Sequence, residues 1–108
     1  MQGRNYFFKI LFKEIVLKRK IKIENLILKN YKPEFFSVVD VSEKHRGHQN
    51  YKEYIESHFE IIIVSEKFKN LNRIERHRMV YQSLKEDFLS DLHSAIIKAY
   101  TIQEYKKT

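Results

Sequence analysis

Histidines are the residues of this chain whose chemistry is best suited to binding a metal centre. There are five, at positions 45, 48, 58, 77 and 93, and there is no cysteine. Disulfide frameworks, thiolate nucleophiles and all-cysteine zinc or iron–sulfur sites are therefore excluded. Metal binding would have to use imidazole or carboxylate groups, and two imidazoles can stand in for two thiolates on a 2Fe-2S cluster, as in Rieske centres.

Four of the histidines lie at or near the ends of predicted strands. His45 and His48 fall in the polar stretch of residues 43–56, which predicts a long loop between two strands. A solvated surface position is the alternative role for such a loop histidine. His93 lies between a predicted helix and a predicted strand, where its alternative role is to donate to the last carbonyls of the helix. We expect His58, at the start of a strand, to be structural.

The fifth histidine lies within a predicted helix that begins near Asn72. Residues recur there at steps of three and four along one mostly apolar stripe, which consists of Ile74, His77, Tyr81, Leu84 and Phe88. This spacing predicts that His77 is a buried, hydrogen-bonded core histidine rather than a ligand, and it places Tyr81 in the core.

Two arginines flank His77 and are predicted to point away from its face. Arg76 and Arg78 lie close to the N-terminus of the helix, where the helix dipole already favours anions. They could contact a carboxylate or phosphate group of a partner, or they could form a solvated basic face.

The remaining patterns predict the elements that position these side chains. A helix ends near Tyr31, because Pro33 lacks a donor and restricts the residue before it. Strand patterns follow at residues 35–42, 59–64 and 94–100, and the β-branched run of the second suits a central strand that is buried on both faces. Residues 101–104 have the pattern of a capping box that opens a short last helix. The predicted order is α-β-β-α-β-α in one α+β domain, since 108 residues with 43% hydrophobic content suffice for one core.

Residues 1–20 have a basic amphipathic pattern. They contain six Lys or Arg residues and one acid, with apolar residues at helical spacing. Lys9, Lys13 and Glu14 interrupt the apolar run, which is too short to cross a bilayer. The segment could extend the first helix and pack on the domain, lie on a membrane surface, or direct the chain to a compartment. We treat it as an extension of a domain that comprises residues 21–108.

The sequence contains no familiar catalytic motif. It has no P-loop, no G-x-S-x-G elbow, no HExxH and no pair of carboxylates at a catalytic spacing. We therefore expect a protein that is not an enzyme. The net charge of +7 permits contact with a polyanion such as DNA without specifying it.

Four segments read together resemble the BolA family. They are VVDVSEKHRGHQ, ESHFEIIIVSEKF, RIERHRMVYQSL and DLHSAIIKAYTIQEY, which contain S-H-F, V-S-x-x-F and R-H-R-x-V-Y in order. The resemblance runs from about Ile21 to Tyr105. It implies a KH-like fold with a three-stranded mixed sheet and helices packed on one face. Relatives usually have glycine where this chain has Asn70, which can adopt the same left-handed turn at modest cost.

The resemblance also implies a function for two of the histidines. Members of the family are partners of monothiol glutaredoxins, and the two proteins share a 2Fe-2S cluster to which a glutaredoxin cysteine and a glutathione thiolate contribute two ligands. Matched residue by residue, the other two ligands fall on His48 and His93, with His45 as the alternative in the loop. No cofactor is then expected to bind tightly to the isolated chain, and Arg76 and Arg78 could contact glutathione.

The second function that the family implies is regulation of transcription. Bacterial relatives are associated with DNA binding, which here would use the basic helix around Arg73, Arg76 and Arg78. The KH-like fold alone is a weak argument for nucleic-acid binding, because the chain has no GxxG loop that could approach phosphates. We expect a cytoplasmic protein, or a mitochondrial matrix protein if residues 1–20 act as a targeting segment.

Overall fold

The computed structural model of the chain describes residues 2–41, 57–88 and 92–108. Its elements follow the predicted order α-β-β-α-β-α, with one short 3-10 helix added. They are α1 (Gln2–Tyr31), β1 (Phe35–Asp40), β2 (Ser57–Val64), η2 (Glu66–Phe68), α2 (Arg73–Phe88), β3 (Leu92–Tyr100) and α3 (Ile102–Lys106). The predicted α+β fold class is confirmed.

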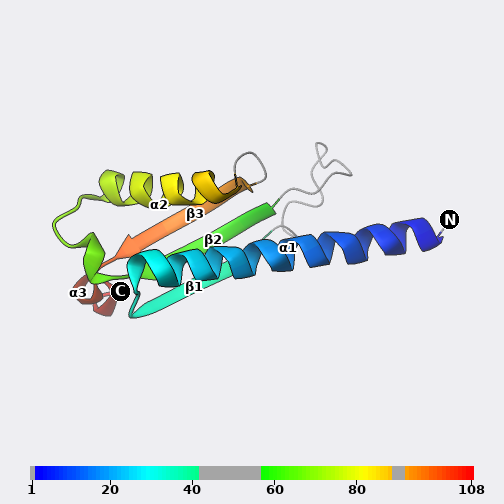
Figure 1. The fold of residues 1–108 in the computed structure, drawn as a ribbon. Coiled ribbons are helices and arrows are strands. Elements are labelled where there is room, and N and C mark those ends of the chain that lie inside the picture. The colour runs from blue at the N-terminus through cyan, green and yellow to red at the C-terminus, as the bar shows by residue number, and fades with distance from the viewer. Residues whose placement is uncertain (1, 42–56, 89–91) are drawn as a thin grey trace.

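The three strands form one mixed sheet in the order β1-β2-β3 (Figure 1). Strand β2 pairs antiparallel with β1 and parallel with β3, so the predicted central position of residues 59–64 is confirmed. Its two faces differ, however. Phe59, Ile61 and Ile63 are buried on the inner face, whereas Glu60 is exposed on the outer face. The expectation that both faces are buried is therefore wrong for most of the strand, because α1 and α2 cover the inner face, and of the described side chains on the outer face only Val64 at the end of β2 is buried.

The core lies between that inner face and the two long helices. Alternate residues of each strand point inward, as the period of two in a strand requires. The buried cluster combines them with side chains of α1, η2 and α2, and consists of Ile23, Leu26, Ile27, Tyr31, Val38, Phe59, Ile61, Ile63, Phe68, Val80 and Leu84. The short helix α3 lies at one end of the sheet, where the Tyr105 ring stacks on that of Phe35 at 5.3 Å between centroids.

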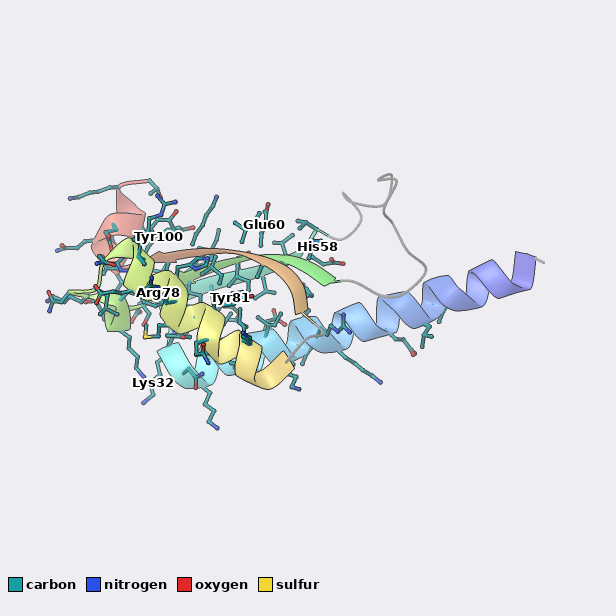
Figure 2. All side chains as sticks on the ribbon, turned by 90° about the horizontal axis from the view of Figure 1, so that it is seen from above. Lys32, His58, Glu60, Arg78, Tyr81 and Tyr100 are labelled. Atoms are coloured by element: carbon teal, nitrogen blue, oxygen red, sulfur yellow. The ribbon has the colours of Figure 1, made fainter. Side chains whose placement is uncertain are left out.

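Helix α1 ends at Tyr31, as Pro33 predicts. Lys32 leaves the helical conformation with a φ of 42°. At the other end α1 continues without a break through the predicted extension, and its N-terminal half runs past the edge of the sheet (Figures 1 and 2). No helix in the described ranges is long and apolar enough to span a bilayer. The division of the chain at residue 20 stays a prediction.

Two local signals of the sequence set the start of α2 and the turn that precedes it. Asn72 and Glu75 exchange side-chain hydrogen bonds with each other's backbone N–H groups, at 2.8 and 2.9 Å, which satisfies free donors at the helix start. Asn70 has a φ of 68°, so it adopts the left-handed turn that the sequence predicts for it. Together they turn the chain from η2 into α2.

Candidate functional site

The backbone ends of three segments meet at one end of the sheet. Strand β1 finishes there, because it runs antiparallel to β2, and β2 and β3 both begin there. The ladder ends with a hydrogen bond of 2.8 Å from the Val41 N–H to the His58 carbonyl, and His58 pairs with Ser94 of β3. The chain that carries His45 and His48 therefore leaves the sheet after Val41 and returns to it at Ser57, next to the start of β3.

The pairing of β2 with β3 is irregular at His93. Ser57 pairs with Leu92 and His58 pairs with Ser94, so His93 is an extra residue between two consecutive pairs. Such an irregularity is typical of positions where a strand redirects a side chain. The backbone of His93 belongs to β3, but its side chain lies outside the described residues, as do His45 and His48 entirely. Of the predicted ligand set, the structure therefore places only the backbone of His93, at the same end of the sheet as Val41 and Ser57, between which His45 and His48 lie in the sequence.

His58 lies on the outer face of β2, on the side of the sheet away from α2 (Figure 2). Its side chain is half-buried, and it stays a predicted structural residue. In the described ranges no group of three or more histidine, cysteine or carboxylate residues is placed to hold a metal ion.

A second candidate site is a groove between the N-terminal half of α2 and the end of β3. Its volume is about 680 Å³, and its lining includes Arg73, Arg78 and Lys98, all of which are exposed. The one carboxylate in the lining, Glu104, is paired with Arg76. The groove therefore carries a positive charge suited to an anionic group. Sequence reasoning missed Lys98, although the alternation of β3 could have placed it on the exposed face.

Arg76 is used inside the molecule rather than offered to a partner. Its Nε donates to the Leu71 carbonyl at 2.9 Å, and its Nη1 donates to the Ala99 carbonyl at 3.2 Å and to the Glu104 carboxylate at 2.7 Å. The guanidinium also lies 6.0 Å from the centre of the Phe68 ring, and 11% of the side chain is exposed. These contacts tie α2, β3 and α3 together, so of the two predicted anion contacts only Arg78 is exposed (Figure 2).

The acid in this ion pair has a strongly perturbed ionisation. The pKa of Glu104 falls from 4.5 to about 2, first because the backbone N–H of Thr101 donates to its carboxylate and then because Arg76 does. The bond from the Thr101 N–H is 2.7 Å long and is one half of the capping box that opens α3. The capping box predicted for residues 101–104 is confirmed.

The prediction that His77 and Tyr81 belong to the core is wrong. Both side chains are exposed, Tyr81 by 45%, and their rings stack on each other at 6.1 Å between centroids. Ile74 on the same predicted stripe is 62% exposed, and of the stripe's described side chains only Leu84 is buried. The helix is rotated from the predicted orientation, so that Val80 and Leu84 face the sheet.

Polar residues on the true inner face explain this error. Alongside Val80 and Leu84 that face carries Ser83, whose hydroxyl donates to the Met79 carbonyl at 3.0 Å and lies 3.2 Å from the Tyr31 hydroxyl. Burial raises the pKa of Tyr31, and the contact with Ser83 partly offsets the rise. A serine satisfied by the helix itself is tolerated in a core, but in the sequence it reads as a surface position.

Comparison with known proteins supports the family resemblance that the sequence motifs indicate. The family model described as BolA-like protein matches residues 27–104. A protein of Vibrio cholerae named DNA-binding transcriptional regulator BolA is 35% identical over 85 residues, which cover 79% of this chain and 76% of that protein. The protein of the same name from Escherichia coli is 34% identical over 85 residues, or 79% of this chain and 77% of its own.

Solved structures agree with the fold as well as the sequence. The BolA domain of SufE1 from Arabidopsis thaliana superposes with a TM-score of 0.70 at 35% identity, and the match covers 80% of this chain and 94% of that one. BolA1 from the same plant gives a TM-score of 0.67 at 31% identity, over 79% and 93% of the two chains. The sequence match, the element order and the sheet topology thus agree, and the chain belongs to the BolA family.

Proposed function

We propose that this chain is a non-enzymatic partner of a monothiol glutaredoxin and that it contributes His48 and His93 as ligands to a 2Fe-2S cluster shared by the two proteins. The observation that supports this most is the backbone convergence at one end of the sheet. His93 is the extra residue between two strand pairs there, and the segment carrying His48 departs and returns beside it.

The donor chemistry of the chain fits half of such a site. Iron accepts imidazole nitrogen, and two imidazoles are enough for one iron of a 2Fe-2S centre. The chain has no thiolate to complete the set. The remaining ligands would come from the glutaredoxin cysteine and from glutathione. A site of this kind would form only between the two proteins, with His45 as the alternative ligand in the loop.

Reconstitution with a monothiol glutaredoxin, iron, sulfide and glutathione tests the proposal. We expect a coloured complex whose visible absorption and circular dichroism change in His48→Ala and in His93→Ala. His77→Ala is the matched control, because that side chain is exposed on α2 and lies outside the proposed site. If neither ligand variant alters the spectrum, the assignment is wrong. If the spectrum changes in His45→Ala but not in His48→Ala, His45 is the loop ligand instead of His48.

DNA binding is the second candidate function, and the basic groove beside α2 favours it. Relatives at 34% and 35% identity are named DNA-binding transcriptional regulators. In this chain Arg73, Arg78 and Lys98 would contact phosphate groups. Each contact removed by an alanine substitution should lower the slope of log affinity against log salt by about one.

Titration of labelled DNA with Arg78→Ala and with Lys69→Ala separates this function from simple charge. Lys69 is also exposed but is not part of the groove lining. Equal losses of DNA affinity in the two variants would mean that the chain binds DNA through its net charge and not through the groove. DNA binding that survives in His93→Ala would show that it does not depend on the proposed cluster ligand.

A further inference from the structure

Helix α1 carries a line of exposed apolar side chains on the side away from the domain. Ile10, Leu17, Ile21 and Leu28 are between 44% and 57% exposed. They follow one another at steps of seven, four and seven residues, each close to a whole number of helical turns, so they lie along one side of the helix. The line is about 27 Å long at ~1.5 Å per residue.

The opposite side of the same helix is already occupied. Ile23, Leu26 and Ile27 are buried against the sheet and α2. Scattered exposed apolar residues are normal on a protein surface, but their alignment along one side of a helix is typical of an interaction site. Helix α1 lies along the outside of the domain (Figures 1 and 2), and its exposed line suits a large, flat partner.

The charge around this line is strongly positive. Residues 1–22 contain seven Lys or Arg residues and one acid, Glu14. Lys18 follows Leu17 and Lys20 precedes Ile21, so these two lysines leave the helix on opposite flanks of the apolar line. Lysines on both flanks of an apolar line can extend their ammonium groups to an anionic surface while their stems stay beside the apolar residues.

We infer that α1 binds the surface of a membrane that contains anionic lipid, with Ile10, Leu17 and Ile21 in the headgroup region and the flanking lysines on lipid phosphates. A second copy of the chain fits less well, because two such helices side by side would bring like charges together. DNA would satisfy the charges but would leave the apolar line in water. Glu14 and Glu24 interrupt the line, which suits a helix that lies in the headgroup layer and does not insert deeply.

Apart from Leu28, this surface lies before the part of the chain that the family model matches. The match begins at residue 27, so Ile10, Leu17 and Ile21 all precede it. Membrane attachment would thus be an addition to the common domain, independent of the proposed cluster site at the sheet. It would place that domain and its partners at a lipid surface.

Sedimentation of the full chain with vesicles tests the inference. We expect the chain to sediment with vesicles of phosphatidylcholine mixed with phosphatidylglycerol, to bind phosphatidylcholine alone weakly, and to be released by added salt. Leu17→Glu should lower the affinity for the mixed vesicles at least about fivefold. Ile74→Glu is the matched control, since it adds the same charge at an equally exposed apolar position on α2 and should bind as the parent does.

Three outcomes would overturn the inference. They are an absence of sedimentation with the mixed vesicles, equal losses in Leu17→Glu and Ile74→Glu, and a dimer in size-exclusion chromatography that Leu17→Glu dissociates while no vesicle binding occurs. Circular dichroism of both variants establishes that they are folded. The glutaredoxin reconstitution should proceed normally in Leu17→Glu, which separates a failure here from a failure of the proposed cluster function.

Discussion

The two ends of the sheet are built in different ways. At the end where β2 and β3 finish, side-chain hydrogen bonds hold three helices in place, because Ser65 donates to the Tyr31 carbonyl of α1 and Arg76 of α2 donates to the Ala99 carbonyl of β3 and the Glu104 carboxylate of α3. At the end where β2 and β3 begin, the ladder closes with the bond from Val41 to His58, and the register is irregular at His93. We call the first the tied end and the second the ligand end. The difference indicates that side-chain bracing is concentrated at one end of the sheet, while the proposed ligand His93 lies at the other.

The tied end contains V-S-x-x-F, one of the motifs that carry the family resemblance, whereas S-H-F lies at the start of β2. In V-S-x-x-F, Val64, Ser65 and Phe68 are all buried. The Ser65 hydroxyl donates to the Tyr31 carbonyl at the end of α1 and accepts from the Lys67 N–H that starts η2. The motif therefore joins α1, β2 and η2. Its role in this chain is to build the fold, and it contributes no candidate ligand.

Arg76 should be the most sensitive polar residue of the tied end. Arg76→Ala leaves the Leu71 and Ala99 carbonyls without their donor and breaks the pair with Glu104. We expect a loss of about 2–3 kcal/mol in the free energy of unfolding, mostly from the two partly buried hydrogen bonds, because a half-exposed ion pair is worth little. Urea denaturation measures it. Arg78→Ala, on the exposed side of α2, should change stability by less than about 0.5 kcal/mol, and equal losses in the two variants would refute the bracing role of Arg76.

Ser65 should come next. Its side chain is buried and makes two hydrogen bonds, of 2.6 and 3.1 Å, that connect the end of α1 to η2. Ser65→Ala should therefore lower the free energy of unfolding by about 1–2 kcal/mol, the usual range for a lost cap together with a buried unsatisfied carbonyl. Ser37→Ala, at a half-buried serine on β1, is the control. A loss at Ser65 no larger than at Ser37 would mean that the tied end does not depend on this hydroxyl.

The tied end should also respond to pH through Glu104. The pKa of this carboxyl is lowered from 4.5 to about 2 in the folded chain, so the charged form stabilises the fold. That contribution is fully present above the ordinary pKa and is lost as the pH falls through the folded pKa near 2. Because the carboxylate is about half exposed, we expect only about 1 kcal/mol. Glu104→Gln should be less stable than the parent at pH 7, and the difference should shrink toward pH 2; a constant difference would contradict the assignment.

Local rules predicted much of the tied end. The stop of α1 before Pro33, the left-handed turn at Asn70 and the capping box of Thr101 and Glu104 are set by neighbouring residues, and all three are confirmed. Each rests on interactions that span at most a few positions of the sequence. Such signals survive in a single sequence because no distant residue is needed to interpret them.

Tertiary contacts explain what the sequence did not reveal. The inner face of α2 includes Ser83 and is bordered by Arg76, whose hydrogen bonds are made to residues that only the fold brings near. The spacing of apolar residues in the sequence therefore predicted that His77 and Tyr81 face the core, whereas in the structure Val80 does. At the ligand end, motif comparison could name His48 and His93, but only the pairing of β2 with β3, across more than thirty residues, shows that Ser57 lies beside the start of β3.

The smallest effect on stability is expected at the ligand end itself. A residue kept for a site that two proteins complete contributes little to the isolated chain, so His93→Ala should change the free energy of unfolding by less than about 0.5 kcal/mol. Phe59→Ala, in the buried part of the same end, should lower the free energy of unfolding by about 3–5 kcal/mol. It is the control that shows that a substitution at this end can destabilise the fold. The comparison is sharpened if His93→Ala retains its stability in urea denaturation while the reconstituted complex changes its visible spectrum. A stability loss in His93→Ala as large as in Arg76→Ala would remove the distinction between the two ends, since His93 would then be bracing the sheet as Arg76 does.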